Sequence, residues 1–406
     1  MRSRVAGTIV SKNYLPLARV LSKSFHEHHP EIPFFVLLAD EVEGYFEPAH
    51  EPFEMLSLED LPIPNLTRFR FQHPQQPLSY ASTPFFLHHL LDLGFSSVLF
   101  YKQEGLVTGD QTPVYERLNE HSIVLTPHLL APLDGADGVT RELNILQSGV
   151  FNIGMLGVSE SSEARRFLEW WEDRTYTHCR LDVAAGLHYE QRWVDLVPAY
   201  FENVHILRDP GANVGHWNLP EREVQAVADG FAVDGGPGRL FRFSGFEPER
   251  PDAVTKHSRR LNLENVGPAA AVFRRYLSLL ESAGYAEARE WPYAYGFFDD
   301  GSPIPDIARH IFLELGENAE RFANPFATEG TDSFFRWLSR PGSEEAPFEI
   351  SPLWKVIYRL RTDVQQAFPN IEGADRESFL AWARNSGAKE HGIPDVFLPS
   401  LPEGRT

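Results

Sequence analysis

The sequence predicts an α/β protein, with a mixed, mainly parallel sheet flanked by helices over residues 1–250 and a mainly α-helical extension over residues 251–406. Two observations support this fold class. Short apolar runs alternate with amphipathic segments in the first half, an order typical of parallel sheets covered by helices. After about residue 255, amphipathic helical segments joined by polar loops replace the apolar runs. No segment recurs at a period of about 20 to 50 residues, which argues against a solenoid.

The first five elements follow from apolar periodicity and from helix start and stop signals. For the helix expected at 83–94, Pro in the first turn and Gly at the end are typical start and stop signals. Strands are expected at 4–10, 32–40 and 96–101, and helices at 14–29 and 83–94. A sheet built in this order binds ligands at the carboxyl ends of its strands.

Composition narrows the class of protein. The 406 residues are 42% hydrophobic and 23% charged, which is ordinary for a globular chain with a large core. The net charge of −20 argues against binding nucleic acid or anionic lipid through overall charge. One cysteine excludes an internal disulfide and a four-thiolate zinc site. The apolar runs are too short for a transmembrane segment, and the N-terminus does not resemble a signal peptide. We expect a cytoplasmic protein, with peripheral membrane association left open.

Polar residues follow two of the apolar runs. Lys102 and Glu104 come directly after the strand at 96–101, where a sheet presents groups to a ligand; an exposed turn is the alternative. Asn152 lies just before Gly154 beside a strand. Its amide can hold hydroxyl groups, or it can cap the backbone of a turn.

Two further segments carry candidate site residues. Glu190 and Gln191 precede a helix-like run, so they are either a base and a positioning group or helix caps. Arg242, Ser244 and Gly245 end a strand at 239–246. A guanidinium beside backbone amides suits a diphosphate, whereas a surface arginine on an edge strand is the alternative.

Large apolar residues recur at helical spacing in the C-terminal region. They are expected to form a core rather than an acceptor or partner surface. They are Phe334, Trp337, Leu338, Trp354, Ile357, Tyr358 and Trp382.

Taken in order, several strings resemble the GT-A glycosyltransferases, and specifically a bacterial group with a helical C-terminal extension. They include TIVSKNYLPLARVLSKSFHEHHP, HHLLDLGFSSVLFY, SGVFNIGMLGV, EQRWVDLVP, DPGANVGHWNL, FRFSGFEPERP and WPYAYGFFDDG. The resemblance covers nearly the whole chain. It implies transfer of a sugar from a nucleotide diphosphate donor to an acceptor, which is a glycan, a small molecule or a protein.

The resemblance also implies positions for the donor. Thr8 and Tyr14 would line the pocket for the nucleotide base, with Tyr14 stacking on it, and Asp40 would hold the base or the ribose. Asn152 and Gly154 would contact the donor or acceptor sugar.

The chain departs from the family where the metal is held. Lys102 and Glu104 stand in the place of the family's Asp-x-Asp motif, and Arg242 replaces its metal-binding histidine. Glu190 and Gln191 replace an Asp-Gln pair near the reacting carbon. A protonated lysine and an arginine have no lone pair for a cation, so no metal or other cofactor is expected.

Two hypotheses follow from this departure. In the first, Lys102 and Arg242 supply the charge of the missing metal, and the chain is a metal-independent glycosyltransferase with Glu190 as a base or front-face carboxylate. In the second, the chain is a catalytically inactive GT-A-like protein that acts as a binding or partner subunit. A nucleotidyltransferase is disfavoured because SKNYLP lacks a Gly-rich basic loop after the first strand.

Overall fold

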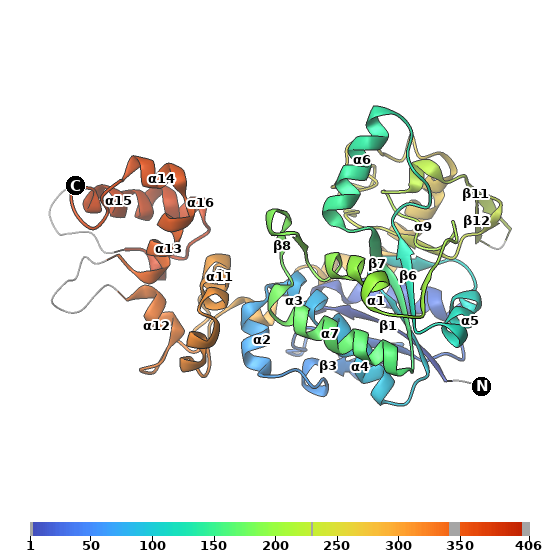
Figure 1. Cartoon of the computed structure of the whole chain (residues 1–406), viewed down its shortest axis with the longest axis horizontal. Coiled ribbons are helices and arrows are strands. Elements are labelled where there is room, and N and C mark those ends of the chain that lie inside the picture. The colour runs from blue at the N-terminus through green and yellow to red at the C-terminus, as the bar shows by residue number, and fades with distance from the viewer. Residues whose placement is uncertain (1–2, 229, 341–349, 400–406) are drawn as a thin grey trace. The chain divides into compact units, whose positions relative to one another are not determined.

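The computed structural model describes residues 3–228, 230–340 and 350–399 (Figure 1). The chain divides into two compact units. The first comprises Met1–Ile63 and Gln76–Tyr293, and the second comprises Pro64–Gln75 and Ala294–Thr406.

The first unit is built on a seven-stranded sheet. The strands, in spatial order, are β10 (Val204–Ile206), β6 (Ile123–Pro127), β7 (Phe151–Ser159), β4 (Ser97–Tyr101), β1 (Arg4–Val10), β2 (Phe34–Leu38) and β3 (Glu54–Ser57). Only β7 runs antiparallel to its neighbours β4 and β6, and the other pairs are parallel. The mixed, mainly parallel sheet expected from the sequence is thus confirmed, and strand 4–10 has the expected bounds.

Helices cover both faces of this sheet (Figure 1). Because side chains alternate along a strand, Ala6 and Val10 of β1 join a core with α1 (Leu15–His26) and α5 (Thr112–Glu120). On the opposite face, α4 (Thr83–Asp92) packs on β4 and on α7 (Ser162–His178). The start of β7 lies at the edge where β4 ends, since Tyr101 pairs with Met155. This edge holds most of the candidate site residues.

Smaller elements complete the first unit. They are α3 (Gln75–Ala81), β5 (Gly105–Val107), α6 (Gly135–Ser148), β8 (Leu181–Asp182), β9 (Leu187–His188), α8 (Val197–Tyr200), β11 (Val224–Val227), β12 (Gly230–Val233), β13 (Gly236–Pro237), β14 (Leu240–Arg242), α9 (Ala270–Ser282) and α10 (Tyr285–Ala288). Residues 251–293 lie in this unit, although the sequence predicted a boundary at 250. The physical reason is that α9 completes the core beside β14, where the rings of Tyr276 and Phe243 stack with centroids 3.7 Å apart.

The second unit is helical. Its helices are α2 (Leu66–Gln72), α11 (Asp306–Glu314), α12 (Phe334–Ser339), α13 (Pro352–Leu360), α14 (Thr362–Ala367), α15 (Arg376–Trp382) and α16 (Ala388–Glu390). The early segment α2 belongs here because Phe71 is completely buried among the rings of Phe312, Phe326 and Phe334. The sequence did not predict this insertion.

The predicted C-terminal core is confirmed. Phe334, Leu338, Trp354 and Ile357 are buried in one apolar cluster, and Trp337, Tyr358 and Trp382 pack against it.

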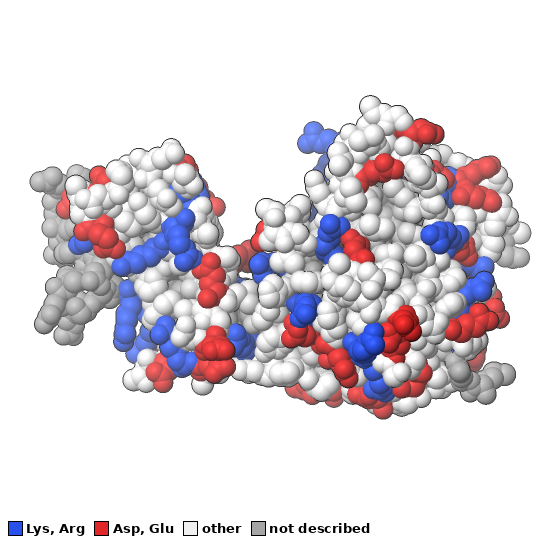
Figure 2. Space-filling view, viewed as in Figure 1, with Lys and Arg blue, Asp and Glu red and all other residues white. Residues whose placement is uncertain are grey.

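Figure 2 shows basic and acidic side chains intermingled over the visible face of each unit, with no large patch of a single charge on that face. Within the described ranges, no helix combines the length and the apolar character that crossing a bilayer requires.

Candidate functional site

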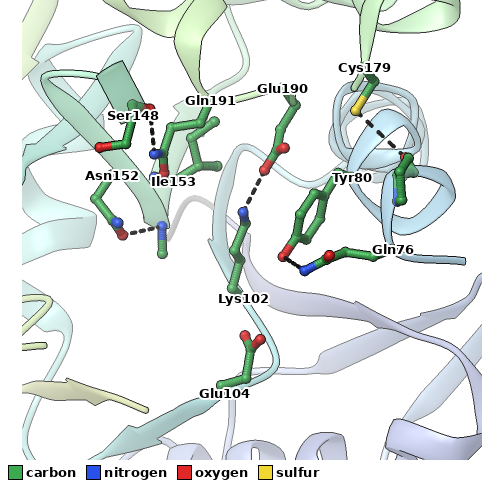
Figure 3. Close-up of polar contacts among 12 residues, drawn as sticks. Gln76, Tyr80, Lys102, Glu104, Ser148, Asn152, Ile153, Cys179, Glu190 and Gln191 are labelled. Atoms are coloured by element: carbon green, nitrogen blue, oxygen red, sulfur yellow. Dashed lines mark hydrogen bonds and ion pairs between the residues drawn. The ribbon is translucent and has the colours of Figure 1, made fainter. Parts of the chain in front are cut away.

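A lysine and a glutamate form the centre of the candidate site. Lys102 follows β4, and its backbone N–H donates to the carbonyl of Gly154, which fixes the residue at the sheet edge. Its Nζ lies 2.6 Å from Oε1 of Glu190, whose side chain is completely buried. Lys102 points towards Glu190 and away from Glu104 (Figure 3). This pair joins two residues that the sequence analysis predicted separately.

The backbone around Glu190 is held firmly. Trp171 of α7 donates from Nε1 to the Glu190 carbonyl at 3.0 Å. The preceding residue, Tyr189, has a φ of 52°, a region that a non-glycine residue occupies only when its surroundings enforce it. Glu190 Oε2 is buried and has no hydrogen-bond partner among the described residues. Within the described ranges, the carboxylate is therefore positioned by its backbone and paired with Lys102 alone.

Tyr80 of α3 is a part of the site that the sequence analysis missed. Lys102 Nζ lies 3.7 Å from the centre of its ring, a cation–π contact. The Tyr80 hydroxyl accepts a hydrogen bond from Gln76 Nε2 at 2.8 Å. Burial, with the nearby charges of Glu104 and Glu190, raises the pKa of Tyr80 well above its usual value, so the ring stays neutral. Nothing in the short segment QQPLSYA marks this tyrosine, because only the fold brings α3 to the end of β4.

A second cation–carboxylate pair lies at the same edge. Arg242, the last residue of β14, donates from Nε to the Glu104 carbonyl at 3.2 Å and from Nη2 to Glu104 Oε2 at 3.4 Å. Its side chain is only 2% exposed, which excludes the surface-arginine alternative. Burial lowers the pKa of Arg242, while Glu104 opposes that shift. Nη1 is buried and has no hydrogen-bond partner within the part of the chain described.

Gly154 allows the arginine to reach this position. A Cβ on Gly154 would lie 1.9 Å from Arg242 Nη1, 2.4 Å from Asn152 Oδ1 and 2.6 Å from Asn213 Oδ1. These three polar atoms therefore surround one point beside β7, and only a glycine leaves room for them. Arg242, predicted from one segment, and Asn152 and Gly154, predicted from another, meet here.

Asn152 is held in a polar network. Its Oδ1 accepts from the Gly154 N–H at 2.8 Å and from Asn213 Nδ2 at 3.0 Å, and its Nδ2 lies 2.8 Å from His128 Nε2. Burial lowers the pKa of His128 to about 3, so this imidazole is neutral and Nε2 accepts. Asn213 has a φ of 58° and was missed by the sequence analysis, although its setting in GANVG indicates a special turn.

Gln191 ties the site to α6. Its Oε1 accepts from the Ile153 N–H at 3.1 Å and its Nε2 donates to the Ser148 carbonyl at 2.9 Å (Figure 3). Gln191 makes no side-chain cap to the 3₁₀ helix that follows it (Arg192–Leu196), so the capping alternative is excluded for this residue. The amide instead joins the end of α6 to the start of β7.

Three predicted donor-binding residues lie around the ends of β1 and β2. Thr8 is buried in β1, and its Oγ1 is without a hydrogen-bond partner among the residues that the structure covers. Tyr14 is 41% exposed, and burial of the remainder together with the charge of Glu104 raises its pKa. Asp40 accepts from the backbone N–H and from Nζ of Lys12, at 3.1 and 3.2 Å. The sequence analysis missed Lys12, which is completely buried.

Ser244 and Gly245 directly follow Arg242 in a turn. The Ser244 carbonyl accepts from Thr255 Oγ1 at 2.8 Å, and the Gly245 carbonyl accepts from the Lys256 N–H at 2.7 Å. Gly245 has a φ of 71°, the conformation that favours glycine. The turn is ordered by these contacts; its predicted role towards a diphosphate stays a prediction.

The residues at the position where the sequence resemblance implies a metal do not fit a divalent cation. Lys102 and Arg242 carry positive charge there and have no donor lone pair. Glu104 and Glu190 are each paired with one of these cations. No group of three or more His, Cys, Asp or Glu side chains that could hold a metal occurs in the described ranges. The formal charges of Lys102, Arg242, Glu104 and Glu190 cancel.

Comparison with known sequences gives relatives without an assigned activity. No family model matches the chain. Two uncharacterised proteins of Bacillus subtilis (strain 168) are similar to it. YfnF is 25% identical over 252 residues, spanning 59% of this chain and 80% of the relative. YfnD is 24% identical over 247 residues, spanning 59% of this chain and 76% of the relative.

Comparison with solved structures finds glycosyltransferases. The galactosyltransferase LgtC, solved with donor and acceptor sugar analogues, matches with a TM-score of 0.40 and 15% identity over 68% of this chain and 95% of that one. The glycosyltransferase GlyE of Streptococcus pneumoniae TIGR4 matches with a TM-score of 0.39 and 13% identity over 73% of this chain and 67% of that one. Both of these solved proteins are glycosyltransferases by name.

Proposed function

We propose that the chain is a glycosyltransferase that moves a sugar from a nucleotide diphosphate donor to an acceptor without a divalent metal. Lys102 and Arg242 stabilise the negative charge of the departing diphosphate. The sequence resemblance supports the reaction class, and the replacement of metal ligands by two cations supports the metal independence.

The buried guanidinium of Arg242 carries this proposal. Leaving one of its nitrogens without a partner is costly, because a buried polar group normally finds a hydrogen bond. Nη1 lies beside Asn152, whose amide is fixed by His128 and Asn213. An anionic oxygen at this point would give Nη1 its missing acceptor, and a charge-assisted bond of this kind is stronger than a neutral one.

Lys102 supplies the second charge. Its ammonium is held between the Tyr80 ring and Glu190 with 13% of the side chain exposed, so it is accessible at one side. A cation held at this point stabilises the negative charge that develops on the departing diphosphate. Gln191 acts as a positioning residue, because its two hydrogen bonds fix the start of β7 next to this cation.

The test is release of nucleoside diphosphate from a panel of UDP-, GDP-, ADP- and dTDP-sugars, each assayed with and without EDTA. We expect turnover of at least one donor that is unchanged by EDTA. Lys102→Met and Arg242→Met should each lower it by at least about 100-fold, the usual cost of removing one transition-state charge partner. Lys23→Met removes an exposed lysine of α1 in the same unit and should leave turnover unchanged.

Two results would contradict the proposal. Strict dependence of turnover on added Mn²⁺ would overturn metal independence. A donor that raises the melting temperature but is never cleaved would instead support a binding or partner subunit.

A further inference from the structure

We propose that binding of a diphosphate at Lys102 displaces Glu190 from the ammonium and is coupled to uptake of one proton by the Glu190 carboxylate. This inference rests on the proposed function, because it requires the diphosphate to bind at this sheet edge. In this inference the protonated Glu190 donates a hydrogen bond to the bound phosphate and does not act as a base.

The balance of charge leads to this conclusion. Lys102 and Glu190 are 2.6 Å apart, and Arg242 and Glu104 form the neighbouring pair at 3.4 Å. Because the four charges cancel, the site has no net positive charge to offer a diphosphate. Uptake of a proton by one carboxylate changes the site from neutral to singly positive when the anion enters.

Glu190 is the carboxylate that is suited to take up the proton. Its side chain is completely buried, whereas the Glu104 side chain is 23% exposed. Glu190 Oε2 has no hydrogen-bond partner in the described residues, so the carboxylate depends on Lys102. A buried carboxylate that loses its counter-ion and gains an anionic neighbour binds a proton more strongly, for two additive reasons.

The Glu190 backbone stays in place during this exchange. Trp171 holds its carbonyl at 3.0 Å, and the strained Tyr189 precedes it. Only the side chain has to rotate, so a protonated carboxyl group remains within reach of a phosphate oxygen on Lys102. The proton comes from solvent, and no covalent bond is made or broken.

The other titratable groups facing Glu190 make different contributions. Burial raises the pKa of Tyr80 of α3, of Tyr189 and of the Cys179 thiol after α7, so all three stay protonated throughout. His188 of β9 is the residue that competes with Glu190 for the proton. Burial and the charge of Lys102 lower its pKa while Glu190 raises it, and a bound anion would raise it further.

The experiment is isothermal titration calorimetry of the full chain with UDP, GDP, ADP and CDP at pH 8. Each titration is run in HEPES and in Tris, whose ionisation enthalpies differ. The change in observed enthalpy between the buffers gives the number of protons taken up. At this pH the nucleotide is almost fully ionised, since its last phosphate pKa is near 6, so the ligand contributes little. The wild-type chain should take up about one proton per bound nucleotide.

Two matched variants assign the proton. Glu190→Gln keeps the shape of the side chain but cannot take up a proton, so binding should persist with an uptake near zero. His188→Gln should retain the wild-type uptake. Melting curves of both variants report whether they fold.

The outcomes separate this inference from the proposed function. Binding with no proton uptake in the wild-type chain, or uptake that persists in Glu190→Gln and vanishes in His188→Gln, overturns the inference and leaves the proposed function standing. No binding of any nucleoside diphosphate overturns the proposed function itself.

Discussion

The two units bury an arginine in opposite ways. In the helical unit, Arg309 of α11 donates from Nη1 to the carbonyls of Phe71 and His73 and from Nη2 to that of Tyr295. Its guanidinium also lies 5.5 Å from the Phe71 ring. In the sheet unit, Arg242 is equally buried but leaves Nη1 without an acceptor in the described residues.

This difference separates an arginine that satisfies backbone carbonyls from one that, under the proposed function, binds a ligand. Arg309 satisfies backbone carbonyls that have lost access to water, so its charge serves the packing of α2 and α11. Among the residues that the structure describes, the Arg242 guanidinium is hydrogen-bonded to Glu104 alone, and Nη1 lies beside Asn152 and Gly154. Unsatisfied buried groups are uncommon in folded proteins because they cost stability, so one that lies among the candidate site residues is a candidate contact for a ligand.

The largest effect on stability is expected from replacing Arg309. Arg309→Met should destabilise the helical unit by about 3 kcal/mol, because it leaves several buried carbonyls without donors. Arg242→Met should change the stability of the sheet unit by no more than about 1 kcal/mol, because it removes a buried charge and leaves Glu104 partly solvated. Hydrogen–deuterium exchange measures the opening of each unit separately.

Equal destabilisation by the two substitutions would show that Arg242 is structural. That result would remove the main support for a ligand at Nη1.

A smaller effect is expected from filling the space beside the Arg242 guanidinium. Gly154→Ala places a methyl group 1.9 Å from Nη1 and should cost about 2 kcal/mol, with loss of nucleotide binding. Gly236→Ala on β13 is the matched control. Its new Cβ meets nothing closer than 3.6 Å, so the free energy of unfolding should change by less than about 0.5 kcal/mol.

Combining substitutions sharpens this test. In the double variant Gly154→Ala, Arg242→Met, part of the cost should disappear, because the flexible thioether side chain can yield where the guanidinium cannot. Additive costs would mean that the methyl group clashes with Asn152 and Asn213 rather than with the arginine.

The sequence predicted the sheet better than it predicted the contacts at its edge. Apolar runs located β1, β2 and β4 because these strands are buried on both faces, and a run of that kind has few alternatives. The rule that ligands bind at the carboxyl ends of parallel strands singled out Lys102, which follows β4. Asn152 and Arg242 were chosen for their chemistry, and the structure places Gly154 of the Asn152 segment beside both Lys102 and Arg242.

The partners of these residues could not be predicted. The pairing of Arg242 with Glu104 spans 138 positions and depends on how β14 pairs with β5. Tyr80 reaches Lys102 from a short helix without any charged residue. Such contacts are set by the tertiary arrangement and by side-chain rotamers, which leave no local pattern in a single sequence. The catalytic and binding roles of the site residues stay predictions.

The smallest expected effect concerns the imidazole that supports Asn152. The folded-state pKa of His128 is about 3, whereas an unfolded histidine titrates near 6.5. Between these values the unfolded chain binds a proton that the folded chain does not, so this contribution to stability is complete above pH 6.5 and is lost as the pH falls. The wild-type chain should lose about 1.4 kcal/mol per pH unit through this one group below that point.

His128→Gln lacks the group but keeps an acceptor for Asn152. The difference in unfolding free energy between the two chains should be constant from pH 7 to 8 and narrow below pH 6.5. A constant difference down to pH 5 would show that His128 is solvated, and that Asn152 is not held as rigidly beside Arg242 as its hydrogen bonds indicate.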